Sequence, residues 1–421
     1  YVLALCYRRR FMSQQNRPWK VLAEKNFGLF WVSLLVSSIG NQLSHVAIGW
    51  QIYELTSSPL QLGLTGVFRA LPVVVFSLSG GVLADRVDRR RLLIFTQTVA
   101  TMLALLLAVL THTGLVRVWH IYAITFLTGA ATTFDLPART ALIPSLVARE
   151  NLSNAFALNV TLRQTATLIG PFFAGVLIAW LGLSGSYFIN AASYLGVIVC
   201  LIAMRVRATE APAKKESAWQ AMKGGLSFVG GHSVILGLLV MDTCVNVFSA
   251  HRLMAPVFAR DILNVGPQGL GALLGAPAIG ALIGSSIIIA MGTPKKSGKL
   301  LLWVTAIYGL LLCAFATSRS FALSLIICFF IGALDSVGET LRVTLIQLIT
   351  PDAMRGRVQS LVHIFVFGFP LLGQGPMGAL GSAMGAAGAV FVGGVLSVLV
   401  VAAVALKLPA IKLFAPEDRK E

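Results

Sequence analysis

The chain has 421 residues, of which 57% are hydrophobic and only 12% are charged, and its mean hydropathy is +0.83. Soluble domains carry about 25% charged residues, so this composition argues against a soluble enzyme, a nucleic-acid-binding module and a disordered protein. It predicts an all-α membrane protein. The net charge of +17 fits the Lys- and Arg-rich cytoplasmic loops of such proteins and needs no nucleic acid.

Apolar runs long enough to cross a bilayer follow one another along the chain, separated by turn and charge signals. The first is too long and too polar for a signal peptide. Met12 resembles a natural start, which would make residues 1–11 upstream sequence. The twelve predicted runs are 28–52, 60–84, 92–112, 118–141, 157–180, 185–204, 232–253, 266–292, 300–317, 321–347, 358–382 and 384–406.

The distribution of Lys and Arg predicts the orientation of these runs. Most basic residues fall in segments on the same side of the membrane as the N-terminus. Few fall in the connections on the other side, where Arg252 and Arg260 are placed. Basic residues mark cytoplasmic loops. We therefore expect a multi-pass protein of the cytoplasmic (inner) membrane, with residues 1–26, 205–231 and 407–421 in the cytoplasm and both termini on that side.

The central segment 205–231 separates two predicted halves of six helices, residues 27–204 and 232–406. A weak repeat relates the halves at a shared offset of about 205 residues, and parallel repeats of this kind are typical of transporters whose site lies between the halves. The matching pairs are Asn41 with Asn246, Pro72 with Pro277, Arg139 with Arg342, and Pro171 with Pro376.

A glycine, an acid and a basic cluster follow the second run. The residues are Gly81, Asp85, Arg86, Arg89 and Arg90, and their spacing resembles the loop signature G-x-x-x-D-R-x-G-R-R of the major facilitator superfamily, except that the second glycine is an aspartate. Further strings resemble the branch that contains enterobactin exporters and macrolide-efflux proteins. They are Leu55-Thr-Ser-Ser-Pro59, Pro137-Ala-Arg139, Asn154-Ala-Phe-Ala-Leu-Asn159 and Arg355-Gly-Arg-Val358.

This resemblance implies roles for two segments. The acid of the loop, Asp85, would stabilise the outward-open state, although the same cluster would also serve as a simple membrane anchor. In the fifth run, Gly170, Pro171 and Gly175 resemble the G-P-x-x-G-G signature of antiporters, with Ala174 at a glycine position. Glycine lets helices approach and proline bends them, so this run could pivot against the eighth. Ordinary Gly and Pro enrichment in membrane helices is the alternative.

Charged residues within the runs are costly in a bilayer and usually face the bundle interior or water. The third, sixth, ninth and twelfth runs contain none, which agrees with the lipid-facing helices of the family. Helical spacing predicts the ion pairs Asp135–Arg139 and Glu339–Arg342. Asp335 and Glu339 repel each other, so one of them could bind a proton. The predicted proton-coupling residues are Asp242, Asp335, Glu339 and Asp135, with purely structural ion pairing as the alternative.

A polar lining for a substrate cavity is predicted from the first, second, fourth, fifth and seventh runs. Asn41, Gln42 and His45 share one helical face, and Arg69 and Arg163 have no local acid, so they would suit an anionic or catecholate-like molecule. Packing roles are the alternative. The predicted cavity residues are Arg69, Arg163, Asn41, Gln42, His45, Asn246 and Arg139.

The sequence contains no Walker loop, nucleophile elbow or metal-ligand spacing, so we expect no enzyme activity, no cofactor and no metal. We expect a monomeric secondary transporter whose partners are a small-molecule substrate, protons and the lipid bilayer, and not nucleic acid. Its predicted function is proton-coupled efflux of an amphipathic organic molecule, such as a siderophore or drug, by alternating access. An uncoupled facilitator or a lysolipid flippase, and a non-transporting sensor or scaffold, are the alternatives.

Overall fold

The structure is a computed structural model that describes residues 18–204, 218–292, 294, 296–351, 354–409 and 411. Within these ranges, the side chains of residues 18–20, 77–86, 218–222, 360, 363 and 367 lie outside the description. The described residues are helical almost throughout, which confirms the predicted all-α class. Among them, 9 helices are long and apolar enough to cross a membrane.

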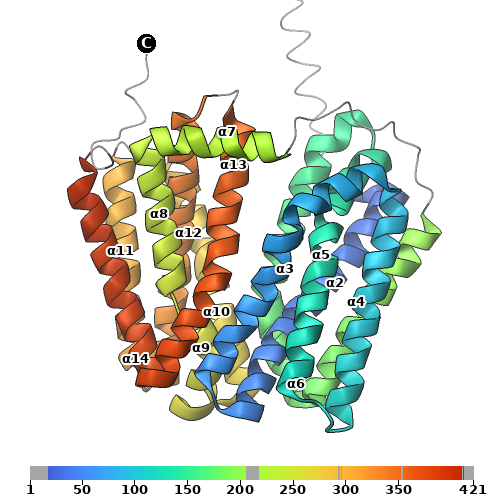
Figure 1. The fold of residues 1–421 in the computed structure, drawn as a ribbon, viewed down its shortest axis with the longest axis horizontal. Helices are drawn as coiled ribbons and strands as arrows, with labels where there is room; N and C mark the ends of the chain where they lie inside the picture. The colour runs from blue at the N-terminus through green and yellow to red at the C-terminus, as the bar shows by residue number, and fades with distance from the viewer. Residues whose placement is uncertain are drawn as a thin grey trace, which may run out of the picture.

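The helices form two groups that stand side by side (Figure 1). The first group consists of η1 (Pro18–Ala23), α2 (Lys25–Thr56), α3 (Pro59–Arg86), α4 (Arg89–His112), α5 (Val118–Leu146), η2 (Arg149–Asn151) and α6 (Leu152–Ala203).

The second group follows the connecting helix α7 (Ala218–Gly231) and includes two short π-helical segments, η3 and η5. It consists of α8 (Ser233–Phe248), α9 (His251–Val257), η3 (Phe258–Ile262), α10 (Gly266–Met291), α11 (Ser297–Thr317), α12 (Phe321–Ile349), α13 (Arg355–His363), η5 (Ile364–Gly368) and α14 (Phe369–Lys407).

Two glycines turn long helices into pairs of arms. Gly182 inside α6 has φ 69° and Gly385 inside α14 has φ 78°, a left-handed backbone that glycine adopts without a steric penalty. The fifth and sixth predicted runs are the two arms of α6, and the last two runs are the arms of the segment that ends in α14. Every predicted run except the seventh coincides with a helix or an arm, while the count of twelve crossings stays a prediction.

One predicted boundary was wrong. The seventh run was expected to end at residue 253, but α8 breaks at Ser249 and Ala250, and the helical chain then continues through α9 and η3 to Ile262. The apolar span covers Ser233–Ile262. Arg252 and Arg260 therefore belong to helical segments and not to a connection.

The two groups contact each other through α3 with α14 and through α6 with α10, with smaller contacts from α9 to α2 and α3. A Cβ atom added to Gly378 would lie 2.8 Å from the Cα of Gly63, and one added to Gly175 would lie 2.7 Å from the Cα of Gly271. These backbone-to-backbone contacts gather at the end of the bundle where α2 ends and α3 begins, which we call the closed end (Figure 1).

The opposite end carries α7, which lies across the helices of the second group (Figure 1). The sequence predicted a short amphipathic stretch at Trp219–Val229, and α7 confirms it. It packs on α13, where a Cβ at Gly225 would lie 3.0 Å from the carbonyl oxygen of Arg357. At this end the helix is thus fixed to the second group.

Polar hydrogen bonds join α2 to the second arm of α6. Tyr187 donates its hydroxyl to Gln51 over 2.9 Å, and Asn190 donates to the Ser44 hydroxyl over 2.7 Å. Both Tyr187 and Asn190 are buried. Buried polar groups need such partners, so this ladder holds the two helices in one register.

Candidate functional site

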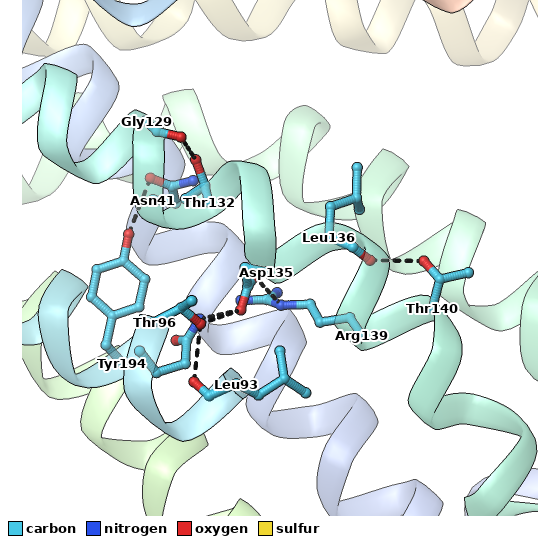
Figure 2. A network of polar contacts seen from close by, with 11 residues as sticks. Asn41, Leu93, Thr96, Gly129, Thr132, Asp135, Leu136, Arg139, Thr140 and Tyr194 are labelled. Carbon is cyan, nitrogen blue, oxygen red and sulfur yellow. Dashed lines mark hydrogen bonds and ion pairs between the residues drawn. The ribbon is translucent and has the colours of Figure 1, made fainter. Parts of the chain in front are cut away.

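The Asp135 carboxylate of α5 is bound by side chains of two helices (Figure 2). Arg139, one turn along α5, forms an ion pair with it. From α4, Gln97 donates its amide to Asp135 Oδ1 over 2.8 Å, and the Thr96 hydroxyl donates over 3.2 Å. Asp135, Thr96 and Gln97 are buried. The ion pair predicted from the spacing is present, and the charge is compensated within the first group.

Thr96 and Gln97 were not predicted as site residues. Their signal in the sequence is two adjacent polar side chains near the start of the apolar run 92–112. A buried polar side chain generally has a hydrogen-bond partner, so such a pair indicates a polar group on a neighbouring helix. Identifying that group as Asp135 requires knowledge of how α4 packs on α5.

Asp242 of α8 forms an ion pair with Arg342 of α12, and both side chains are deeply buried, 4% and 9% exposed. Asn246, one turn along α8, donates its amide to the same oxygen, Asp242 Oδ1, over 2.9 Å. The other oxygen, Oδ2, is buried and has no hydrogen-bond partner among the described residues. The predicted pair of Glu339 with Arg342 is wrong, because Arg342 turns from its own helix toward α8.

Asp335 and Glu339 lie on α12 close enough to Asp242 for their charges to interact with it. Asp335 is half-buried and Glu339 is exposed. No ion pair with a described residue holds either carboxylate. The structure therefore brings three of the four predicted proton-coupling carboxylates together in the second group, and it places Asp135 in the first.

Arg252 joins this acidic cluster, although the sequence placed it in an outer connection. It stands in the first turn of α9, after the break in the helical chain, and its side chain is exposed. It lies close enough to Glu339 for their charges to interact. The break itself was not predictable, because the run of apolar residues continues through Ser249 and Ala250.

The predicted cavity residues of the first group lie on neighbouring helices but do not form one contact network. Arg69 of α3 and His45 of α2 are half-buried and close enough for their charges to interact, and no hydrogen bond or ion pair from a described residue reaches either side chain. Asn41 accepts a hydrogen bond from Tyr194 of α6 over 3.3 Å. Arg163 of α6 is exposed.

The structure shows which groups are bound by Arg89 and Arg90, two residues of the loop signature. The side chain of Arg89 donates to the Ala141 carbonyl of α5 over 2.9 Å, and that of Arg90 donates to the Leu201 carbonyl of α6 over 2.7 Å. Asp88, which stands at the usual glycine position, accepts from the Arg91 amide over 2.8 Å and caps α4. Cations near helix C-termini are stabilising, so these arginines tie helix ends together.

The other residues of the loop signature, Gly81, Asp85 and Arg86, belong to α3, but their side-chain surroundings lie outside the description. The gating role predicted for Asp85 therefore stays a prediction.

The glycines of the fifth predicted run mark close helix contacts on α6. A Cβ at Gly170 would lie 3.0 Å from Cγ of Gln42, and Gly175 meets the backbone of α10. Pro171 lies between them inside the helix. The contact of the fifth run with the eighth is thus present, and the pivoting motion stays a prediction.

A hollow of about 210 Å³ lies between the ends of α10 and α12 that face the α7 side of the bundle. Its lining is mostly apolar and includes Ile288, Ile289 and Leu341, together with Thr340 and Thr344. None of the predicted cavity residues lines it. Among the described residues, no group of three His, Cys, Asp or Glu side chains is placed to hold a metal ion.

Comparison with known proteins agrees with this architecture. The enterobactin exporter EntS of Shigella boydii serotype 18 is 26% identical over 361 residues, which cover 85% of this chain and 86% of that protein. EntS of Escherichia coli O1:K1 matches at the same identity and coverage. The nucleoside transporter NupG has a similar fold, with a TM-score of 0.69 at 11% identity, over 91% of this chain and 98% of that one.

A second solved structure has the same fold. It is a bacterial homologue of the human lysosomal transporter Spinster in an inward-facing, unoccupied conformation, with a TM-score of 0.71 at 13% identity, over 92% of this chain and 97% of that one. The two groups of helices have the fold of these neighbours, and the match to the EntS exporters together with the family match given next defines the chain as a multi-pass membrane transporter of the major facilitator superfamily. The model of the transmembrane secretion effector family matches residues 16–420, and the chain belongs to that family.

Proposed function

We propose that this transporter exports an amphipathic organic molecule with acidic groups, such as a siderophore or a drug, in exchange for protons. The halves 27–204 and 232–406 would alternate their access between the two sides of the cytoplasmic membrane. The relatives named as enterobactin exporters support the substrate class. The protein would work as a monomer.

The arrangement of side chains around Asp242 is the observation that supports the proposed proton coupling. Arg342 and Asn246 both bind Oδ1, which leaves a buried carboxylate oxygen, Oδ2, without a partner among the described residues. A proton at Oδ2 would neutralise Asp242 and weaken its hold on Arg342. Because an unpaired charge is costly in a membrane interior, Arg342 would then turn toward Asp335 or Glu339 and change the packing of α12 against α8.

The first group would supply the substrate wall. Arg69 is a half-buried guanidinium for which no described residue provides an acid, and His45 lies nearby. A guanidinium binds carboxylates and other planar anions through two parallel hydrogen bonds. An acidic group of the substrate would be the counterion of Arg69, with Arg163, Gln42, Asn41, Arg139 and Asn246 as further lining residues.

We infer that the closed end faces away from the cytoplasm and that both termini lie inside, which makes this an inward-facing state. The solved inward-facing neighbour supports this assignment. Asp85 would stabilise the opposite, outward-open state, and Gly170, Pro171 and Gly175 would let α6 pivot on α10 during the exchange.

The test is proton release by the purified protein in weakly buffered detergent solution. Enterobactin is added to the wild type and to Asp242→Asn, with Glu150→Gln as the control, because Glu150 is an exposed carboxylate in η2. We expect proton release on binding in the wild type and in Glu150→Gln, and none in Asp242→Asn. A lysophospholipid is the second probe.

Enterobactin binding without proton release in any of the three proteins would contradict proton coupling and favour an uncoupled facilitator. Binding of the lysophospholipid with no binding of enterobactin would contradict the substrate class and favour a flippase.

A further inference from the structure

Three polar side chains converge at the closed end, away from the carboxylates described above. The Tyr53 hydroxyl, in the last turn of α2, donates a hydrogen bond to Asp261 Oδ2 in η3. Arg260, the neighbour of Asp261, donates from Nη1 to the Tyr53 carbonyl oxygen over 3.1 Å. Its guanidinium also lies 5.6 Å from the centroid of the Tyr53 ring. Tyr53 is thus bound through its hydroxyl, its ring and its backbone.

These contacts join the two groups of helices, because Tyr53 belongs to the first and η3 to the second. Arg260 and Asp261, whose side chains are partly exposed, also form an ion pair at 3.8 Å. The Tyr53 carbonyl already accepts a hydrogen bond from the Ser57 amide that ends α2. Arg260 therefore places a positive charge at the C-terminus of α2, where the helix dipole attracts a cation.

The rest of the contact between the groups is mostly apolar or made of backbone. Glycines on α3, α6, α10 and α14 let helices approach each other closely. Close packing alone, however, does not provide directional bonds such as hydrogen bonds. Among the described residues, one further hydrogen bond crosses at this end, from the Leu60 amide to the Ser382 hydroxyl over 2.9 Å. Hydrogen bonds to charged groups are stronger than neutral ones, so the Tyr53 contacts dominate the polar part of this interface.

We propose that Tyr53, Arg260 and Asp261 form a latch that holds the closed end shut. Opening of this end requires α2 and η3 to separate, which breaks the hydroxyl, carbonyl and ring contacts together. The free energy of these contacts thus sets how often the closed end opens in the absence of substrate. The latch rests on the alternating access of the proposed function, and it needs neither the proton step nor a particular substrate.

The experiment measures distances across the closed end in nanodiscs. Spin labels are attached at Leu115→Cys and Arg319→Cys, which replace exposed residues in the connections after α4 and α11, in a chain whose native cysteines are replaced by serine. Pulsed electron paramagnetic resonance then records the distance distribution without substrate or a pH gradient. The latch variants are Tyr53→Phe and Arg260→Gln.

Tyr122→Phe is the matched control, because the Tyr122 hydroxyl donates to the Gln61 carbonyl over 2.9 Å entirely within the first group. We expect the ratio of open to closed distances to rise about tenfold in each latch variant and to stay at the wild-type value in Tyr122→Phe. Melting temperatures of the same samples show that all variants are folded.

Wild-type distributions in both latch variants would overturn the latch, and so would an equal shift in Tyr122→Phe. Because the samples contain no substrate and no proton gradient, such a result would leave the export proposal standing. Conversely, loss of proton release in the substrate experiment would not affect the distances.

Discussion

Arg342 binds a carboxylate on another helix, whereas Arg139, its counterpart in the sequence repeat, binds one on its own helix. Arg139 is paired with Asp135 of α5 and is further supported by the α4 side chains that hold that carboxylate. Arg342 is paired with Asp242 and thereby joins α12 to α8. The repeat thus conserves the position of the cation and not the helix that supplies its partner.

Loss of Asp242 should destabilise the protein strongly. In Asp242→Asn the buried guanidinium of Arg342 keeps its charge without a counterion, which costs about 3–5 kcal/mol of unfolding free energy. The double variant Asp242→Asn/Arg342→Gln removes both charges and should recover most of that loss while transport stays absent. Thermal unfolding in detergent and uptake into vesicles measure the two effects. A double variant as unstable as the single one would contradict the pairing.

Removal of Arg90 should weaken the first group modestly. Its guanidinium binds the carbonyl oxygens of Leu201 and Ile202 at the end of α6, at a partly exposed position where solvent screening reduces the gain. We expect Arg90→Gln to lower the free energy of unfolding by about 1 kcal/mol. The neighbouring Arg91→Gln removes an exposed side chain and serves as the control in the same unfolding experiment. Equal losses in both variants would show that the carbonyl contacts contribute nothing.

A larger side chain at Gly175 should prevent the two groups of helices from closing at the closed end. Its Cβ would lie 2.7 Å from the Cα of Gly271, so Gly175→Val pushes α6 away from α10. Overpacking of this kind costs about 1–3 kcal/mol, which should reduce transport at least tenfold. Gly196→Val on the second arm of α6 is the control, because nothing lies within 4 Å of a Cβ there. Uptake assays in proteoliposomes compare the two variants. Full activity of Gly175→Val would show that the transport cycle does not require close contact between α6 and α10.

Arg69 should determine the affinity for acidic substrates. Charge-assisted hydrogen bonds to a carboxylate or catecholate are worth roughly 1.5–3 kcal/mol, so Arg69→Gln should weaken binding about tenfold or more. Arg319→Gln changes an exposed arginine outside the predicted cavity and leaves binding unchanged. Calorimetric titration with enterobactin compares the two variants. An unaltered dissociation constant in Arg69→Gln would remove Arg69 from the substrate wall.

Much of the architecture was predictable because bilayer-spanning helices are local features of the sequence. The runs, the amphipathic α7 and the pair Asp135–Arg139 depend only on hydropathy and helical spacing. The partner of Asp242 was not predictable, because Arg342 reaches it from a helix about 100 residues away and only the packing of α8 on α12 brings them together. The latch at Tyr53 was missed for the same reason, and also because the seventh run was expected to end before Arg260.

The bends at Gly182 and Gly385 determine where foreign sequence can be inserted. At these bends one helical arm follows the other with a single non-helical glycine between them, so an insertion there would fall directly between two helices. The connection after α4 is different, because residues 113–117 lie between two separate helices, α4 and α5, and are mostly exposed. An epitope tag or a binding loop grafted at residues 113–117 should therefore leave the bundle intact and report which side of the membrane this end occupies.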